Sequence, residues 1–139
     1  MSSLKTKCLK SITVLSLAAA LTACVNPVKE QHNSLVGNWQ IVDIQGQAIS
    51  NDKARLIFSE EGSVAGNNGC NNVMGTYQPV HDHLNLSPLA TTRMACKSAA
   101  QQDAQAFTQA LTHVEHFLVK GDALYLTDMQ DETVITLKK

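Results

Sequence analysis

The sequence predicts a mainly β fold, a small antiparallel meander or β-barrel-like domain with one packed α-helix. Three observations lead to this prediction. The chain has 139 residues, which is enough for one ordinary domain. Short segments with a two-residue apolar period alternate with turn residues. One longer segment has the apolar spacing of an amphipathic helix.

Seven short segments have the pattern that is typical of strands. Leu56 and Phe58 share one face of the second segment, and Leu124 and Leu126 share one face of the sixth. The segments are residues 38–44, 55–59, 63–66, 83–87, 116–120, 123–127 and 133–137. Closing such a set into a barrel removes the exposed strand edges that invite aggregation.

The helix is predicted between the fourth and fifth strand segments. Its apolar residues recur at intervals of four and three, at Ala100, Ala104, Phe107, Leu111 and Val114. Ser98, with Gln101 three residues later, fits a capping box at the start of the helix. We expect the apolar stripe, anchored by Phe107 and Leu111, to pack against the sheet or to plug one end of a barrel.

The N-terminal segment has the features of a secretory signal. Lys5, Lys7 and Lys10 precede an apolar run over residues 11–21, which is too short to span a bilayer as a stable helix. The following residues, 21–24 (LTAC), resemble the lipobox of bacterial lipoproteins. That resemblance implies cleavage before Cys24 and acylation of Cys24, by palmitate among other chains. The alternative is a plain signal peptide whose first mature residue happens to be cysteine.

Charge and composition add to the interpretation of this leader. The whole chain has 11 basic and 12 acidic side chains, and this near-neutral balance argues against a nucleic-acid binder. The three leader lysines leave with the signal, so the mature domain is mildly acidic. Two or more acyl chains, rather than a basic patch, would therefore hold the protein at the membrane. By the same resemblance, Val25 after the cysteine favours the outer membrane, facing the periplasm.

The predicted organisation is a signal peptide over residues 1–23, a lipidated tether over 24–34 and one domain over 35–139. Cys8 leaves with the signal and Cys24 takes lipid, so Cys70 and Cys96 enter an oxidising compartment as an even pair. We predict a Cys70–Cys96 disulfide, which would stabilise the domain by about 3–4 kcal/mol on the chain-entropy model. A redox-catalytic pair is the alternative, although the sequence has no C-x-x-C motif.

Two motifs that carry these cysteines resemble the META domain family, whose bacterial members include HslJ-type heat-inducible lipoproteins. The residues that carry the resemblance are Gly66, Asn67, Asn68, Gly69, Cys70 and Asn71, then Gly75, Thr76 and Tyr77, then Thr92, Arg93, Met94, Ala95 and Cys96. The resemblance extends from about residue 35 to residue 137. It implies a small antiparallel β fold, barrel-like, with a packed helix. It also implies an association with envelope stress and novobiocin resistance, and it brings no catalytic residues.

The motifs also have a direct physical interpretation. Residues 66–72 (GNNGCNN) combine residue types that tolerate left-handed backbone, which predicts a tight or bulged turn that positions Cys70. Alternatively, the clustered asparagine amides line a polar pocket or form a recognition surface. Arg93 could pair with a carboxylate such as Asp43, or it could be an exposed contact.

Motifs for catalysis and metal binding are weak. The sequence contains no G-x-S-x-G, H-E-x-x-H, P-loop or G-x-G-x-x-G motif. The clusters that resemble metal ligands are residues 81–83 (HDH), with His81 and His83, and residues 113–116 (HVEH), with His113 and His116. A solvated turn for the first pair and a helix-to-strand junction for the second are the expected structures, rather than a metal site. No cofactor is expected.

These observations together predict a non-enzymatic envelope lipoprotein. Its leading role is a binding or support module during envelope or heat stress, with an envelope protein as partner and the membrane contacted through acylated Cys24. The alternative is a carrier of a lipid or small apolar molecule inside the barrel, with the helix as a lid.

Overall fold

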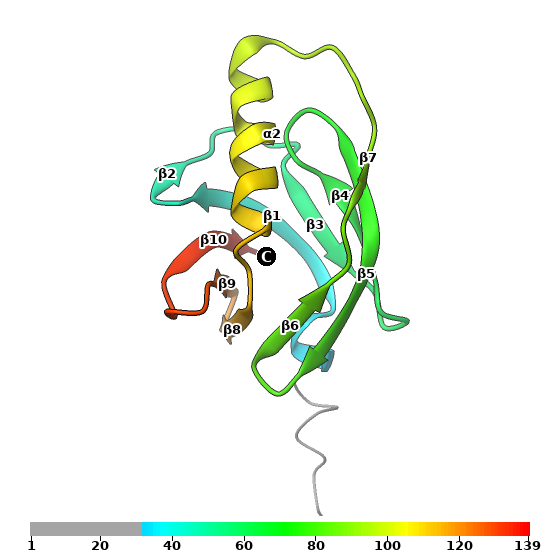
Figure 1. Cartoon of the computed structure of the whole chain (residues 1–139), viewed down its shortest axis with the longest axis vertical. Helices are drawn as coiled ribbons and strands as arrows, with labels where there is room; N and C mark the ends of the chain where they lie inside the picture. The colour runs from blue at the N-terminus through cyan, green and yellow to red at the C-terminus, as the bar shows by residue number, and fades with distance from the viewer. Residues whose placement is uncertain (1–31) are drawn as a thin grey trace, which may run out of the picture.

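A closed antiparallel β-barrel with one packed helix forms the domain (Figure 1). The structure is a computed structural model, and it describes residues 32–139. The strands are β1 (Gly37–Ile44), β2 (Gln47–Ala48), β3 (Arg55–Phe58), β4 (Ser63–Asn67), β5 (Asn72–Val80), β6 (His83–Leu86), β7 (Ala90–Thr91), β8 (His116–Lys120), β9 (Ala123–Thr127) and β10 (Thr133–Lys138). The helix α2 (Ser98–Leu111) lies between β7 and β8 in the chain.

The barrel closes because β1 pairs with both β3 and β10. Around the wall the order is β1, β3, β4, β5, β6, β8, β9, β10, and every neighbouring pair is antiparallel. The two short strands lie off this ring, with β2 beside β1 and β7 beside β5. The predicted mainly β, barrel-like class with one packed helix is therefore correct.

Buried aliphatic and aromatic side chains fill the barrel interior. Trp39 and Phe58 are its largest fully buried members, Leu124, Leu126 and Ile135 pack with them, and Phe107 of α2 joins the same core cluster. The indole N–H of Trp39 donates to the carbonyl of Leu35 at 2.7 Å, which satisfies its one buried polar group. The interior that was suggested as a place for an apolar ligand is thus occupied by the protein's own side chains.

All seven predicted strands are present, with small differences at their ends. The ranges 116–120 and 123–127 match β8 and β9, and their turn contains Gly121 with a positive φ of 56°. The long strand β5 was not predicted, because Gly75 and Pro79 interrupt its pattern. Pro79 is tolerated because the pairing of β5 with β4 ends at Thr76, so no β4 partner needs a hydrogen bond from residue 79.

The helix begins differently from the prediction. Its N-cap is Lys97, with extended backbone and no side-chain hydrogen bond, so the predicted Ser98–Gln101 capping box is wrong. Ser98 is instead the first helical residue. Ala104, Phe107 and Ala110 are buried, whereas Leu111 is only partly buried. Val114 lies beyond the helix, in the segment that leads to β8.

The predicted signal peptide, the acylated Cys24 and most of the tether lie outside the described residues. The last three residues of the predicted tether, 32–34, belong to a helical turn that begins the fold. The His32 ring stacks on Tyr77 with centroids 5.5 Å apart. Among residues 32–139, no helix is long and apolar enough to cross a membrane.

Candidate functional site: a groove between α2 and β7

Two hollows of the described surface adjoin one another between α2 and the segment from β6 to β7. One, of about 530 Å³, is lined mainly by amide side chains: Asn68, Asn71, Gln101, Gln105 and Gln109. The other, of about 520 Å³, has an apolar floor that includes Val73, Leu86, Leu89, Phe107, Leu111 and Val114. Thr91 and Thr108 line both. We call these the amide hollow and the apolar hollow, and together the α2–β7 groove.

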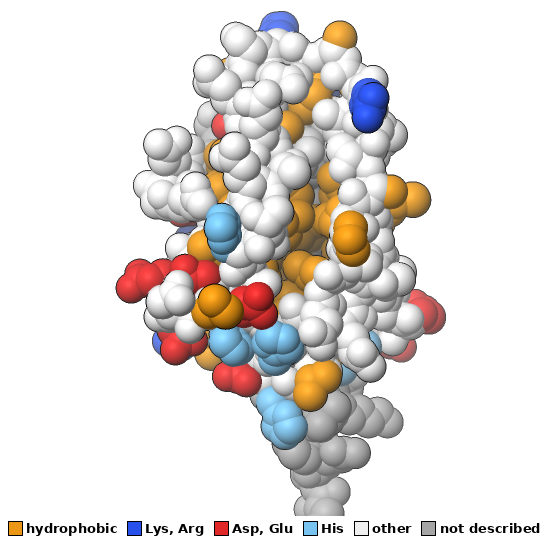
Figure 2. Space-filling view, viewed as in Figure 1, with side chains coloured by type: hydrophobic (Ala, Val, Ile, Leu, Met, Phe, Trp, Pro, Cys, Tyr) orange, Lys and Arg blue, Asp and Glu red, His pale blue; other side chains and the backbone are white. Residues whose placement is uncertain are grey.

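The groove exists because strands β6 and β8 are paired over only a short length. We call the contact between these two strands the β6–β8 seam. Strands β6 and β8 pair at only one position, His83 with His116. Beyond that position the chain preceding β8 is helical, so β7 faces α2 instead of another strand (Figure 1). Figure 2 shows the resulting depression, with hydrophobic side chains on its floor.

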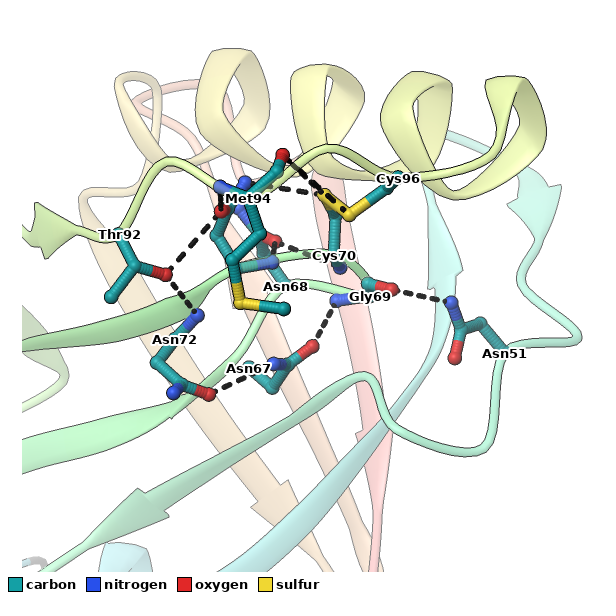
Figure 3. Close-up of a disulfide and its surroundings, with 10 residues drawn as sticks. Asn51, Asn67, Asn68, Gly69, Cys70, Asn72, Thr92, Met94 and Cys96 are labelled. Carbon is teal, nitrogen blue, oxygen red and sulfur yellow. Dashed lines mark hydrogen bonds between the residues drawn. A yellow bond between two sulfur atoms is a disulfide. The ribbon is translucent and has the colours of Figure 1, made fainter.

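The cysteine motifs lie at the upper end of this groove, where Asn68 and Asn71 line the amide hollow. Figure 3 shows the disulfide and the hydrogen bonds around it. Cys70 and Cys96 form a disulfide with a Cα–Cα distance of 5.8 Å. The disulfide ties the turn between β4 and β5 to the segment that enters α2. The β4–β5 turn is thereby held beside the start of α2, close to the amide hollow.

Buried asparagines hold the turn itself. The side-chain oxygen of Asn68 accepts hydrogen bonds from the backbone N–H of Cys70, at 3.1 Å, and of Asn71, at 2.8 Å. The side-chain oxygen of Asn71 accepts from the backbone N–H of Met94 at 2.7 Å and from the Thr92 hydroxyl at 3.3 Å. The GNNGCNN segment therefore has the structural role that its composition indicated, and the two buried asparagines also line the amide hollow.

The other glycine and asparagine residues of the motif support the same turn. Gly69 has a φ of 100°, and its carbonyl accepts a hydrogen bond from the Asn51 amide at 2.8 Å. Asn67 accepts from the Gly69 N–H at 2.8 Å. A Cβ at Gly66 would collide with the backbone carbonyl of Arg55 in the neighbouring strand β3. Glycine at position 66 is thus required by close packing of two strands.

Two further motif residues, Gly75 and Tyr77, lie on β5. Gly75 sits under Leu89 and Ser87, where an added Cβ would lie 2.6 Å from the Leu89 side chain. Tyr77 is buried on β5, and its hydroxyl donates to the carbonyl of Ser59 at 2.7 Å. Burial, and then the charge of Glu61, raise the pKa of the Tyr77 phenol above its ordinary value.

Arg93 does not pair with Asp43. Arg93 is exposed and makes no ion pair with any residue in the described range, while the Asp43 carboxylate accepts from the Gly46 N–H at 2.9 Å in the β1–β2 turn. Of the two alternatives for Arg93, the pair with Asp43 is therefore absent, because Asp43 lies on β1 whereas Arg93 lies in the segment between β7 and α2. The backbone N–H of Met94 donates to the Asn71 side chain in the β4–β5 turn, whereas the Met94 side chain is 55% exposed.

The histidines pair in a way that the sequence clusters did not suggest. His81 is in the β5–β6 turn with a φ of 59°, and His113 is in the turn after α2, so the predicted turn and junction are correct. Instead His83 and His116 meet across the seam, with ring centroids 5.4 Å apart. Within residues 32–139, no three His, Cys, Asp or Glu side chains are grouped as metal ligands.

The chemistry of the groove is that of hydrogen bonding and apolar contact. Of the residues lining its two hollows, Glu115 alone is charged, and it lies 3.8 Å from His83. The Ser87 hydroxyl accepts a hydrogen bond from the Thr76 N–H. No hydroxyl among the groove residues is hydrogen-bonded to a histidine or carboxylate that could activate it.

Sequence reasoning did not identify the helical wall of this groove. Gln101, Gln105 and Gln109 recur at intervals of four, which places them on one face of α2. That spacing is visible in the sequence. Their position opposite β7 depends on how the helix docks, which no local pattern contains.

Comparison with known families decides the identity of the domain. The META domain family matches residues 33–139. The chain belongs to the META domain family. The match includes both cysteine motifs and the whole barrel with its helix.

Solved structures share the fold of this META domain. A protein from Burkholderia xenovorans, solved by NMR, has a TM-score of 0.61 at 23% identity and covers 96% of this chain and 97% of its own. A second NMR structure has a TM-score of 0.60 at 21% identity over 82% and 94% of the two chains. A crystal structure of a DUF4847 family protein from Bacteroides vulgatus has a TM-score of 0.58 at 16% identity over 78% and 96%. A search of curated proteins finds no match.

Proposed function

We propose that this META domain protein is a non-catalytic binding module of the cell envelope, and that its partner binds in the α2–β7 groove. The observation that carries the proposal is the groove itself, about 520 and 530 Å³ in its two hollows, with an almost uncharged lining. Recognition sites combine an apolar floor with a few polar groups in this way. The lack of a nucleophile hydrogen-bonded to a base in the groove is consistent with binding without catalysis.

The anchoring part of the proposal is supported by the leader. Residues 5–24 combine a basic start, an apolar run and a lipobox-like site, so acylated Cys24 would hold the domain at the periplasmic face of the outer membrane. The resemblance to HslJ-type lipoproteins supports a role in envelope or heat stress, including novobiocin resistance. An envelope protein is the partner that such a location makes accessible.

Site-specific photo-crosslinking in cells tests this function. A photoreactive benzoylphenylalanine at Gln105 places the probe in the amide hollow, and the same residue at Leu118 places it on the outer face of β8. We expect an adduct from position 105 that position 118 does not form. Adducts that are equal at both positions, or absent at both, would contradict a groove-specific partner. Cys24→Ala, which removes the proposed anchor, should reduce the adduct, and an undiminished adduct would contradict the requirement for anchoring.

A small apolar ligand is the second candidate, and the apolar hollow favours it. Its floor of Phe107, Leu111 and Val73 adjoins the hydrophobic core, and its volume is in the range of small-ligand sites. The ligand would lie between α2 and the sheet rather than inside the packed barrel. Native mass spectrometry of the protein purified from its own cells would reveal a copurifying lipid, which Leu111→Gln should displace. A spectrum of the bare chain alone would argue against this role.

A further inference from the structure

We propose that the α2–β7 groove takes an extended peptide segment of the partner, which adds to β7 as one more antiparallel or parallel strand. This inference rests on the proposed binding function and specifies the chemistry of the ligand. It is carried by three features: a free strand edge, a buried amide without an acceptor, and an uncharged wall of glutamines.

The free edge follows from the register of β7 on β5. The backbone N–H of Thr92 donates to the carbonyl of Asn72 at 3.1 Å, and Thr91 stands opposite Val73. Backbone groups of an antiparallel strand point alternately toward and away from the partner strand. The N–H and C=O of Thr91 therefore point away from β5, toward α2.

Nothing in the described chain uses these two groups on the groove side. No described residue outside β5 forms a backbone or side-chain hydrogen bond with the N–H or C=O of Thr91. Thr91 lines both hollows, so its edge is at the centre of the groove. An extended peptide satisfies such an edge by strand addition, in which main-chain hydrogen bonds supply affinity.

The upper end of the groove contains an unused donor. Asn68 is only 3% exposed, and its side-chain oxygen is fully engaged by two backbone N–H groups. No residue of the described chain accepts a hydrogen bond from the Nδ2 of Asn68, although Asn68 lines the amide hollow. A buried donor without an acceptor is costly unless a bound group satisfies it. A peptide carbonyl is an acceptor of the right kind.

The opposite wall matches the same ligand. Gln101, Gln105 and Gln109 present both amide donors and amide acceptors along one face of α2. These groups are complementary to peptide N–H and C=O groups, and none of them carries a charge. Below them, the apolar hollow accepts side chains that project from the added strand, and Glu115 at its lower end disfavours an acidic peptide there.

The alternatives fit these features less well. A lipid chain would use the apolar hollow and leave Thr91 and Asn68 unpaired. A glycan would require an exposed aromatic ring to stack on, whereas Phe107, the one aromatic residue in the lining, is 1% exposed. The predicted ligand is consequently an uncharged or basic extended peptide with at least one apolar side chain.

A display library of random linear peptides is the probe for this proposal, selected against the folded, oxidised domain. Selected peptides are then measured for binding to Thr91→Pro and to its matched control Thr91→Val. Both substitutions remove the hydroxyl, but only proline removes the N–H. Because that N–H is not part of the β5 ladder, proline is tolerated at such an edge position. We expect about tenfold weaker binding to Thr91→Pro and near wild-type binding to Thr91→Val.

Amide hydrogen exchange provides a measurement that does not depend on the variant folding. Binding of a selected peptide to the wild-type domain should slow exchange at the Thr91 amide, while the Thr92 amide, already bonded to Asn72, should change little. Equal binding to both variants, or an unchanged Thr91 amide, would overturn strand addition. Failure to select any peptide would overturn the peptide as ligand. A groove-specific crosslink from position 105 would still stand in that case, so the two proposals fail separately.

Discussion

His83 on β6 and His116 on β8 form the one registered pair that joins these two strands, and their rings meet edge to face at 5.4 Å. Two backbone hydrogen bonds flank the pair, from Leu84 N–H to the Glu115 carbonyl and from Phe117 N–H to the Asp82 carbonyl, both 2.9 Å long. Strands β8 and β9, by comparison, are in register at five positions. Closure of the barrel beside the groove thus depends on few paired residues between β6 and β8.

The first prediction concerns this seam. His116→Ala removes the ring contact with His83, and we expect the free energy of unfolding to fall by about 1 kcal/mol. Amide exchange at Leu84 and Phe117 should accelerate more than in the rest of the barrel, because their bonds cross the seam. His113→Ala is the control, since His113 is exposed in the turn after α2. Similar exchange rates in both variants would show that the ring pair does not stabilise the seam.

The second prediction concerns the disulfide. Cys96→Ser should lower the free energy of unfolding by about 2–4 kcal/mol, because the cross-link no longer restricts the unfolded chain. Thermal denaturation would show this as a fall of several degrees in Tm. Reduction of the wild-type protein should produce a similar fall, whereas the variant should not respond to reductant. A Tm that is the same with and without the cross-link would contradict a stabilising role.

The third prediction concerns the asparagine that ties Met94 to the turn. Asn71→Ala leaves the partly buried N–H of Met94 without its 2.7 Å acceptor and also removes the acceptor of the Thr92 hydroxyl, and we expect the free energy of unfolding to fall by about 1–3 kcal/mol. Urea unfolding measures the difference. Asn72→Ala is the neighbouring control, because Asn72 is exposed and its side chain bonds only to Asn67. A larger loss at position 72 than at position 71 would refute this account of the turn.

The fourth prediction concerns alkaline pH. Because burial raises the pKa of Tyr77, the folded state favours the neutral phenol. The neutral phenol therefore contributes to the free energy of unfolding at neutral pH. This contribution is lost as the pH rises through the pKa of tyrosine in the unfolded chain, about 10, and on through the higher pKa of Tyr77 in the folded protein. Tyr77→Phe should cost about 1 kcal/mol at neutral pH, from the lost bond to Ser59, and should reduce the loss of stability above about pH 10.

Glu61→Gln is the companion variant for that experiment. It removes the negative charge of Glu61 and leaves Tyr77 buried. The pKa of the Tyr77 phenol should therefore be somewhat lower than in the wild type and still above the ordinary pKa of tyrosine. Ultraviolet absorbance of the phenolate follows the titration directly. A Tyr77 pKa that is restored to the ordinary value by this change would contradict burial as the main cause.

The strands that sequence reasoning found are those whose apolar residues alternate without interruption. Leu124 and Leu126 on β9 are both buried, and the predicted range agrees with the strand. β5 was missed although it pairs with three other strands, because Gly75 and Pro79 hide its alternation. Each has a tertiary explanation: Leu89 and Ser87 leave no space for a Cβ at Gly75, and the β4 pairing ends before Pro79.

By itself, the sequence determined the fold class, most strands, the helix and the pairing partners available to Cys70 and Cys96. These follow from local periodicity, turn chemistry and the count of cysteines, all of which act over short distances along the chain. Only the tertiary structure decided the groove, the β6–β8 seam and the free edge of Thr91. Each of these features is formed by segments that are far apart in the sequence. The spacing between those segments is set by packing on the core and by the hydrogen bond between Asn71 and Met94.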